Sequence, residues 1–369
     1  MIIRTEDFQK FTKVLLSNLY VNALMPGSDL LELKSGKDFL YLNMGNMDYS
    51  QILSIPIPGV EEKDLHATVD AAKFLNLVSK MTSETIEMEK VENGLKIEGN
   101  GVYILPIEFL DNEMYTVSKL EVGEVFCDFS CSAKELDTIQ NYNSKQLDRG
   151  YSSNPVQQLY YLDEKGCLTF TSGATICTFD FPKPFKVLLN NKTVKLFKIF
   201  SSLGDEDLNI KLGHYEIDSN KIGTRIRIES PSYVLTAACP SDDLINQIPY
   251  QIIRNRGLQN YDNEVIIQND HLQSALDRFL IFLDKHYTDV DVHFSNVGMT
   301  LKYGKNEEEL FYQKPISVEL NYDLILDLNY LKSVVTSLSY KFIKLRFGDH
   351  QSISVVTENI VHVIPEIGE

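Results

Sequence analysis

Apolar residues recur at helical spacing in three stretches of this chain, and short runs of alternating apolar and polar residues follow each one. The stretches are residues 69–107, 190–240 and 328–367. Each predicts a helix, then two or three strands, the last one rich in Val, Ile or Leu. Leu75, Leu196 and Leu331 lead the copies and are about 120 to 135 residues apart. This is the spacing of small domains, not of a solenoid repeat, so the pattern predicts three similar domains in tandem.

Two polar stretches separate the copies. Residues 111–124 and 241–264 are rich in turn-forming and polar residues, which is typical of linkers. They divide the chain into predicted domains at residues 1–122, 123–250 and 251–369. Each predicted domain also begins with a strand-like run and a further helix. We therefore expect an α+β fold in which each domain has two helices packed on antiparallel sheets.

The first helix of each predicted domain carries an apolar stripe and a capping residue at its start. The stripe of the third domain comprises Leu272, Ala275, Leu276, Phe279 and Leu283. The predicted N-caps are Thr5 in the first domain, Ser132 in the second, and Asn269 or Asp270 in the third.

Basic side chains recur on the predicted helices of a chain whose formal net charge is −17. An acidic surface repels phosphate, so DNA binding would require the basic residues to gather on one face. Two interpretations stay open: ordinary solvated side chains, or a cationic face along one side of a ring or arc. The predicted DNA-facing residues are Lys10, Lys13, Lys73, Lys80, Lys134, Lys192, Lys195, Lys198, Arg278 and Lys332.

Two small apolar surfaces are predicted at opposite ends of the chain. Ile281 projects away from the stripe of its helix, with Phe282 at the margin; the alternative is a wide buried helix face. The apolar strand 102–107 contains Pro106, and proline is confined to edge strands or strand ends. One such surface in the first domain and one in the third would give a head-to-tail contact, which closes into a ring if the geometry allows.

The sequence contains no catalytic motif. It lacks a phosphate-binding glycine loop, a G-x-S-x-G turn and an H-E-x-x-H pair. The five scattered cysteines include no C-x-x-C pair, as expected for reduced thiols, and we predict no metal or cofactor. The alternative is an enzyme that holds a divalent ion with Glu307, Glu308 and Glu309. Acids in the first eleven residues and the absence of a long apolar run predict a cytoplasmic protein without membrane association.

Taken together, the chain resembles a bacterial-type DNA sliding clamp, the beta subunit of DNA polymerase III, in a divergent form such as a phage or mobile-element version. The resemblance covers nearly the whole chain. It is strongest over residues 73–109 and 327–347 and in the hydrophobic-Pro-hydrophobic ending at 364–367. It implies a DNA clamp fold, a head-to-tail homodimer that forms a six-domain ring, and duplex DNA threaded through the ring without sequence readout. It also implies a non-catalytic role in the cytoplasm of a bacterium or an infected host cell. A DNA polymerase and a clamp loader would bind through short peptide motifs.

The resemblance further implies two protein-binding sites. The dimer interface would join Tyr103, Ile104 and Leu105 to Ile281 and Phe282 of a second copy. A client-peptide pocket between the second and third domains would comprise Val156, Thr171, Gly173, Ala174, Thr175, Ile176, Ile248, Val363, Ile364, Pro365 and Ile367.

The chain also departs from the family. The segment 173–176 reads Gly-Ala-Thr-Ile where the family usually has Gly-His-Arg-Leu, and the family's Pro-Asp-Tyr before the third domain is not recognisable. These changes affect the client pocket, so client specificity does not follow from the resemblance. The second interpretation is a clamp-fold protein that does not encircle DNA and instead sequesters partners or modulates transcription.

Overall fold

The computed structural model describes residues 1–19, 27–92, 94–149, 155–218, 221–259, 261–284, 287–317, 319–348 and 352–367. The chain divides into two compact units. Unit 1 consists of Met1–Asp137 and Lys192–Asp242, and unit 2 of Thr138–Asn191 and Asp243–Glu369. Both combine helices with antiparallel sheets, which confirms the α+β class. The division into three domains at residues 122 and 250 stays a prediction.

Unit 1 repeats one module, in which a strand and a helix are followed by three strands. The first copy is β1 (Ile2–Arg4), α1 (Thr5–Ser17), β2 (Leu30–Gly36), β3 (Phe39–Gly45) and β4 (Tyr49–Pro56). The second is β5 (His66–Asp70), α2 (Ala71–Ser79), β6 (Thr85–Val91), β7 (Gly94–Glu98) and β8 (Val102–Leu105), followed by the short strands β9 (Phe109–Leu110) and β10 (Glu113–Met114). The remaining elements are β11 (Glu124–Ser132), α3 (Ala133–Thr138), α5 (Asn191–Lys195), α6 (Lys198–Leu203), β16 (Asp207–Asp218), β17 (Lys221–Glu229) and β18 (Tyr233–Ala238).

Unit 2 ends with two further copies of this module, which follow a segment of short helices and four strands. It begins with a π-helical turn (Ile139–Asn143), α4 (Ser144–Arg149), a 3₁₀ turn (Pro155–Gln158), β12 (Tyr160–Asp163), β13 (Gly166–Phe170), β14 (Ala174–Thr178) and β15 (Lys186–Leu189). After a 3₁₀ turn (Asp242–Gln247) come α7 (Tyr250–Leu258), β19 (Asn263–Gln268), α8 (Asn269–Phe279), a 3₁₀ turn (Leu280–Phe282), β20 (Asp289–Ser295), β21 (Gly298–Tyr303) and β22 (Asn306–Phe311). The last module is β23 (Asn321–Asp327), α9 (Leu328–Ser337), β24 (Phe342–Phe347), β25 (Ser352–Val356) and β26 (Ile360–Pro365).

Each unit contains one eight-stranded and one four-stranded antiparallel sheet. In unit 1 the orders are β11-β16-β17-β18-β4-β3-β2-β5 and β1-β6-β7-β8. In unit 2 they are β15-β12-β13-β14-β26-β25-β24-β19 and β22-β21-β20-β23. The large sheets join distant parts of the chain, because β4 pairs with β18 and β14 pairs with β26. The sequence pattern did not predict these two strand pairings.

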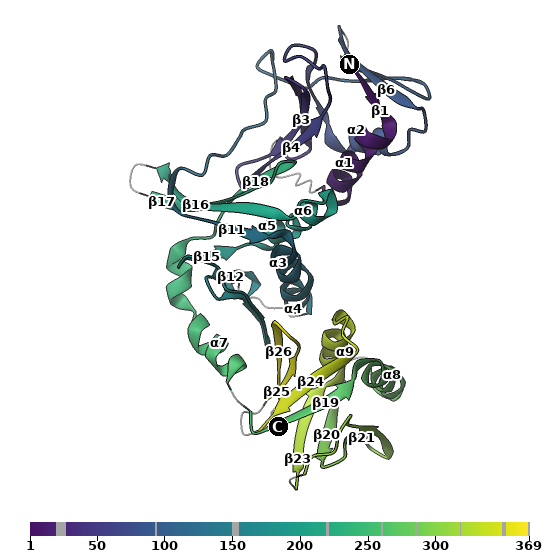
Figure 1. Cartoon of the computed structure of the whole chain (residues 1–369), viewed down its shortest axis with the longest axis vertical. Coiled ribbons are helices and arrows are strands. Elements are labelled where there is room, and N and C mark those ends of the chain that lie inside the picture. Colours follow the sequence, from purple (N-terminus) through teal and green to yellow (C-terminus); the bar gives the residue numbers. More distant parts are fainter. Residues whose placement is uncertain are drawn as a thin grey trace. The chain divides into compact units, whose positions relative to one another are not determined.

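Helices pack against the sheets and against each other within each unit. In unit 1, α1 contacts both α2 and α6 (Figure 1). The Ser201 hydroxyl of α6 donates to Asp137 of α3 over 2.9 Å. In unit 2, α9 contacts α8 and α4 (Figure 1). The predicted stripes face inward: Phe8 of α1 is fully buried and meets Phe74 of α2 edge to face at 6.1 Å.

One of the three predicted N-caps is confirmed. Ser132 and Glu135 form a capping box, in which the Ser132 hydroxyl accepts from the Glu135 N–H and the Glu135 carboxylate accepts from the Ser132 N–H. The prediction of Thr5 is wrong, because α1 begins at Thr5 itself and the Thr5 N–H donates to Glu84 of the neighbouring segment. The prediction for α8 is also wrong, since the residue before the helix is Gln268, whose side chain makes no capping bond.

The predicted linker at residues 241–264 is not an irregular connection. It contains a 3₁₀ turn and the nine-residue helix α7. The buried residues of α7 include Arg254 and Gly257, so its inward face does not show an apolar period. This is why the sequence pattern missed the helix.

A candidate peptide-binding cavity and two exposed contact surfaces

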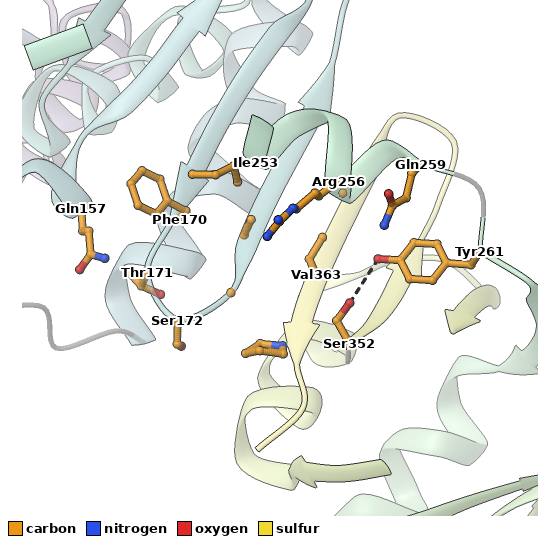
Figure 2. Close-up of a pocket in the computed structure, with 14 residues that line it drawn as sticks. Gln157, Phe170, Thr171, Ser172, Ile253, Arg256, Gln259, Tyr261, Ser352 and Val363 are labelled. Carbon is orange, nitrogen blue, oxygen red and sulfur yellow. Dashed lines mark hydrogen bonds between the residues drawn. The ribbon is translucent and has the colours of Figure 1, made fainter. Parts of the chain in front are cut away.

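A cavity of about 630 Å³ lies in unit 2, between α7, the turn that joins β13 to β14, and β26. Figure 2 shows Arg256 and Ile253 of α7 on one side and Phe170 with Thr171 on another. The hydroxyl groups of Tyr261 and Ser352 share a 3.4 Å hydrogen bond at the edge of the cavity (Figure 2). The lining residues are Gln157, Phe170, Thr171, Ser172, Gly173, Ala174, Ile253, Arg256, Gly257, Gln259, Tyr261, Ser352, Val363 and Pro365.

Two glycines allow the walls of this cavity to approach each other. A Cβ at Gly257 would lie 2.4 Å from the Ile176 side chain and 3.1 Å from that of Val363. A Cβ at Gly173 would lie 2.3 Å from the Val363 carbonyl oxygen. Because these distances are below van der Waals contact, larger residues would push α7 and the β13–β14 turn away from β26.

Helix α7 is fixed to β12 by buried polar and aromatic contacts. The Arg254 guanidinium forms an ion pair with Asp163, and both side chains are 97% buried or more. Tyr250 stacks on Tyr161 with 4.3 Å between ring centroids, and Gln251 donates to the Tyr161 hydroxyl over 3.3 Å. The helix therefore presents Ile253 and Arg256 to the cavity from a fixed position.

A buried polar cluster lies on the other side of β14 and β26 from the cavity. Thr175 and His362, which are directly paired across the two strands, share a 2.8 Å hydrogen bond between Oγ1 and Nδ1. The Asn143 amide donates to the Thr175 carbonyl over 3.0 Å and to the Thr169 hydroxyl over 3.1 Å. Because successive side chains of a strand alternate in direction, Ala174 faces the cavity while Thr175 faces this cluster.

Strand β8 forms one edge of the four-stranded sheet of unit 1, as Pro106 predicted. Val102, Tyr103 and Ile104 on this strand are 63%, 40% and 52% exposed, and Leu105 is half-buried. A row of apolar side chains on a sheet edge is a surface that another chain can cover.

Ile281 and Phe282 form a second exposed apolar surface, in unit 2. They are 77% and 59% exposed and lie in the 3₁₀ turn that follows α8. The alternative of a wide buried helix face is wrong for these two residues, whereas Leu276 and Phe279 on the preceding helix are buried.

The ten predicted DNA-facing residues are exposed or half-buried. In unit 1 they lie on α1, α2, α3, α5 and α6, except Lys80, which directly follows α2. The contacts of α1 with α2 and α6 bring several of them onto neighbouring helices. Several of these side chains form ion pairs with described carboxylates. These pairs are Lys73 with Asp70 at 3.5 Å, Lys192 with Asp48 at 3.9 Å, Lys332 with Asp277 at 2.5 Å, and Arg278 with Glu308.

The acidic cluster at residues 307–309 does not gather around one point. Glu308 pairs with Arg278, and Glu307 pairs with Lys302 at 3.4 Å. Within the described ranges, no group of three His, Cys, Asp or Glu side chains is placed to hold a metal ion. No helix in those ranges is long and apolar enough to cross a bilayer.

Solved structures with the same architecture are bacterial sliding clamps. The DNA polymerase III subunit beta of Pseudomonas aeruginosa superimposes with a TM-score of 0.77 at 14% identity, over 100% of both chains. The DNA polymerase sliding clamp of Bacillus subtilis gives 0.75 at 14% identity, over 100% of this chain and 98% of that one. The DNA polymerase III beta chain of Streptococcus pneumoniae gives 0.75 at 13% identity, over 100% and 99%. This chain has the sliding-clamp fold. No protein-family model and no curated protein sequence matches it.

The clamp fold brings together five of the eleven predicted pocket residues. Thr171, Gly173, Ala174, Val363 and Pro365 line the cavity. Thr175, Ile176 and Ile364 are fully buried and do not line it. Ile248 lines a second cavity of about 640 Å³ on another side of α7. Ile367 is half-buried, and the side chain of Val156 lies outside the described residues.

Sequence reasoning missed the part of the cavity that α7 and its neighbours supply. Phe170, Ile253, Arg256 and Tyr261 were not predicted to line a pocket. The pair Ile252–Ile253 followed by a glycine at 257 was the available signal, since a helical glycine next to apolar residues often marks close packing. The role of all these residues in peptide binding stays a prediction.

Proposed function

We propose that this protein is a DNA polymerase processivity factor: a ring-shaped homodimer that encircles duplex DNA, slides along it and tethers a polymerase. The observation that carries the proposal is the full-length match to sliding clamps, over 100% of this chain and of the Pseudomonas aeruginosa chain. Surfaces of this chain also support the proposed function.

Two exposed surfaces support ring closure by a second copy. Strand β8 offers unpaired backbone groups and the apolar side chains of Tyr103 and Ile104 at a sheet edge. Ile281 and Phe282 offer a separate apolar contact in the other unit. The two surfaces are different, so a pairing of one with the other is head-to-tail, and two such pairings close a ring of two subunits.

The basic helix residues support weak, sequence-independent contact with DNA. Lys10 and Lys13 of α1 lie on a helix that contacts α2 and α6, which carry Lys73 and Lys198. Topological enclosure requires only weak attraction, because the ring holds DNA even when each phosphate contact is short-lived. The net charge of −17 is compatible with this mechanism, since the other surfaces then repel unenclosed DNA.

The cavity supports the tethering of clients. Its apolar wall of Phe170, Ile253 and Val363 can accept the anchoring side chain of an extended peptide. A polymerase or clamp loader held by such a peptide would act at a high effective concentration near the DNA. In this proposal the protein is non-catalytic and acts in the cytoplasm.

The test combines the solution mass with retention on circular DNA. We expect the mass of a dimer, retention on nicked circular DNA after loading, and loss of the protein when the circle is linearised. A monomer that never stays on circles would refute encirclement and favour a partner-sequestering clamp-fold protein. An activity that depends on added divalent metal and on Glu307 or Glu309 would favour the enzyme interpretation.

A further inference from the structure

We infer that Arg256 makes the cavity selective for an extended peptide of a partner protein that carries an acidic side chain two positions from its apolar anchor. The inference rests on the proposed peptide-binding role of the cavity. It adds to that role a preference for an acidic ligand side chain, which Arg256 determines.

Arg256 has an unusual charge environment for an arginine of this chain. Among the described lining residues it is the one charged side chain, it is exposed, and no described residue forms an ion pair with it. Five of the six other arginines with described side chains pair with a carboxylate, namely Arg4, Arg227, Arg254, Arg278 and Arg346. The sixth, Arg225, instead donates to the Glu121 carbonyl and lies over the Tyr215 ring. In a chain with 52 acidic and 35 basic residues, a cation without an acid at a cavity is complementary to an acidic ligand.

The spacing on α7 determines where the acid of the ligand must lie. Ile253 and Arg256 are three residues apart on the helix, so their side chains are neighbours, with Cβ atoms about 5–6 Å apart. Figure 2 shows both on the α7 side of the cavity. In an extended peptide, side chains two residues apart point the same way and are about 6.5–7 Å apart. An apolar anchor against Ile253 and Phe170 therefore places the side chain two positions away beside Arg256.

The backbone position of Arg256 is fixed before any ligand binds. The adjacent turn of α7 is held by the buried ion pair of Arg254 with Asp163, and Gly257 lets the helix lie directly on Ile176 and Val363. A guanidinium that binds a carboxylate forms charge-assisted hydrogen bonds, which are roughly twice as strong as neutral ones. We expect this contact to change affinity by about tenfold.

The experiment measures binding of labelled ten-residue peptides to the full-length protein by fluorescence anisotropy. All four peptides share one Leu anchor. In three of them the positions two residues before and two residues after Leu are both Asp, both Asn or both Lys. In the fourth peptide, Asp stands only at the two positions directly next to Leu. We expect the first peptide to bind about tenfold more tightly than the other three, with a preference that decreases as salt is added.

Variants assign the preference to Arg256. Arg256→Gln should bind the Asp and Asn peptides equally, and Arg256→Glu should prefer the Lys peptide. Lys314→Gln, which removes an exposed cation outside the cavity lining, should keep the wild-type preference. Equal binding of Asp and Asn peptides by the wild type, or an unchanged preference in Arg256→Gln, would overturn the inference and leave the proposed function in place. Failure of every peptide to bind would overturn the peptide-binding role of the cavity and the inference with it.

Discussion

The guanidinium of Arg254 and the carboxylate of Asp163 form an ion pair from which solvent is almost fully excluded, with side-chain exposures of 3% and 2%. Arg254 lies on α7 and Asp163 at the end of β12, so the pair joins the helix to the eight-stranded sheet of unit 2. The helix also carries two cavity residues, Ile253 and Arg256. The geometry of the cavity therefore depends on a contact that lies outside it.

Removing one member of this pair should be strongly destabilising. Arg254→Leu leaves the Asp163 charge buried without a partner, which costs about 3–5 kcal/mol in comparable cases. The denaturant midpoint of unfolding should be lower for Arg254→Leu than for the wild type. The double replacement of Arg254 and Asp163 by Leu should recover much of the loss, because no buried charge remains. If the Arg254→Leu variant is as stable as the wild type, the ion pair does not hold α7 on the sheet.

Ile281→Glu should dissociate the proposed dimer. The substitution places a charge in an apolar contact, and desolvation of that charge opposes association. Sedimentation should report the mass of a monomer. Ile222→Glu is the matched control, since Ile222 is 69% exposed and lies on β17, which belongs to neither proposed contact surface. If Ile281→Glu and the control sediment alike as dimers, the interface assignment is wrong.

Val363→Glu should abolish peptide binding without changing the solution mass. Val363 lines the cavity and is only partly buried, so a charged side chain there can reach solvent but disrupts the apolar wall. Anisotropy with the Leu-anchored peptides measures the loss. The neighbouring Ile364 is fully buried in the core, so Ile364→Glu would test folding instead of the pocket. Binding retained by a folded Val363→Glu variant would refute the cavity assignment.

Replacing lysines on neighbouring helices of unit 1 should weaken the contact with DNA in a salt-dependent way. Lys10→Gln, Lys195→Gln and Lys198→Gln remove three exposed charges of the predicted DNA-facing set. The slope of log affinity against log salt for short duplexes should fall by up to about three, roughly 0.9 for each lost phosphate contact. Lys314→Gln again serves as the control. An unchanged slope would place these lysines away from DNA.

Glu264 should contribute a small, pH-dependent part of the stability of unit 2. Partial burial alone would raise the pKa of the Glu264 carboxyl, but hydrogen bonds and positive charge from Arg346 and Lys344 outweigh it and lower the pKa below its ordinary value of 4.5. A lowered folded-state pKa means that the contribution is present above the ordinary value and is lost as pH falls through the folded value.

The comparison of wild type with Glu264→Gln tests this sign. Because Glu264 is 38% exposed, the difference in free energy of unfolding at neutral pH should be at most about 1 kcal/mol. It should disappear in unfolding curves measured well below pH 4.5. A difference that grows with acid would contradict the assignment of the ion pair.

Elements with a strong local signal were predicted correctly. The apolar spacing of Leu272, Leu276 and Phe279 identified the buried face of α8, and Pro106 identified β8 as an edge strand. Ser132 was recognisable as a cap because its glutamate partner is three residues away. In each case the deciding interaction lies within a few residues of the chain, where a pattern can show it.

The features that were missed depend on contacts between distant residues. Helix α7 buries an arginine, and that position becomes favourable only because Asp163 lies opposite, about ninety residues earlier. The same holds for the cavity, where Phe170, Ile253 and Val363 come from three segments that are far apart in the chain. Periodicity cannot show such pairs, since neither partner is unusual in its own stretch of sequence.

The pairing of β4 with β18 and of β14 with β26 has a consequence for how the chain acquires its structure. The strand near residue 50 pairs with a strand near residue 235, and the strand near residue 175 pairs with one near residue 362. Each large sheet therefore closes only after a long stretch of chain has been synthesised, and strand edges remain open in the meantime. The nascent protein is accordingly expected to fold slowly and to benefit from a chaperone that shields those edges until their partners emerge.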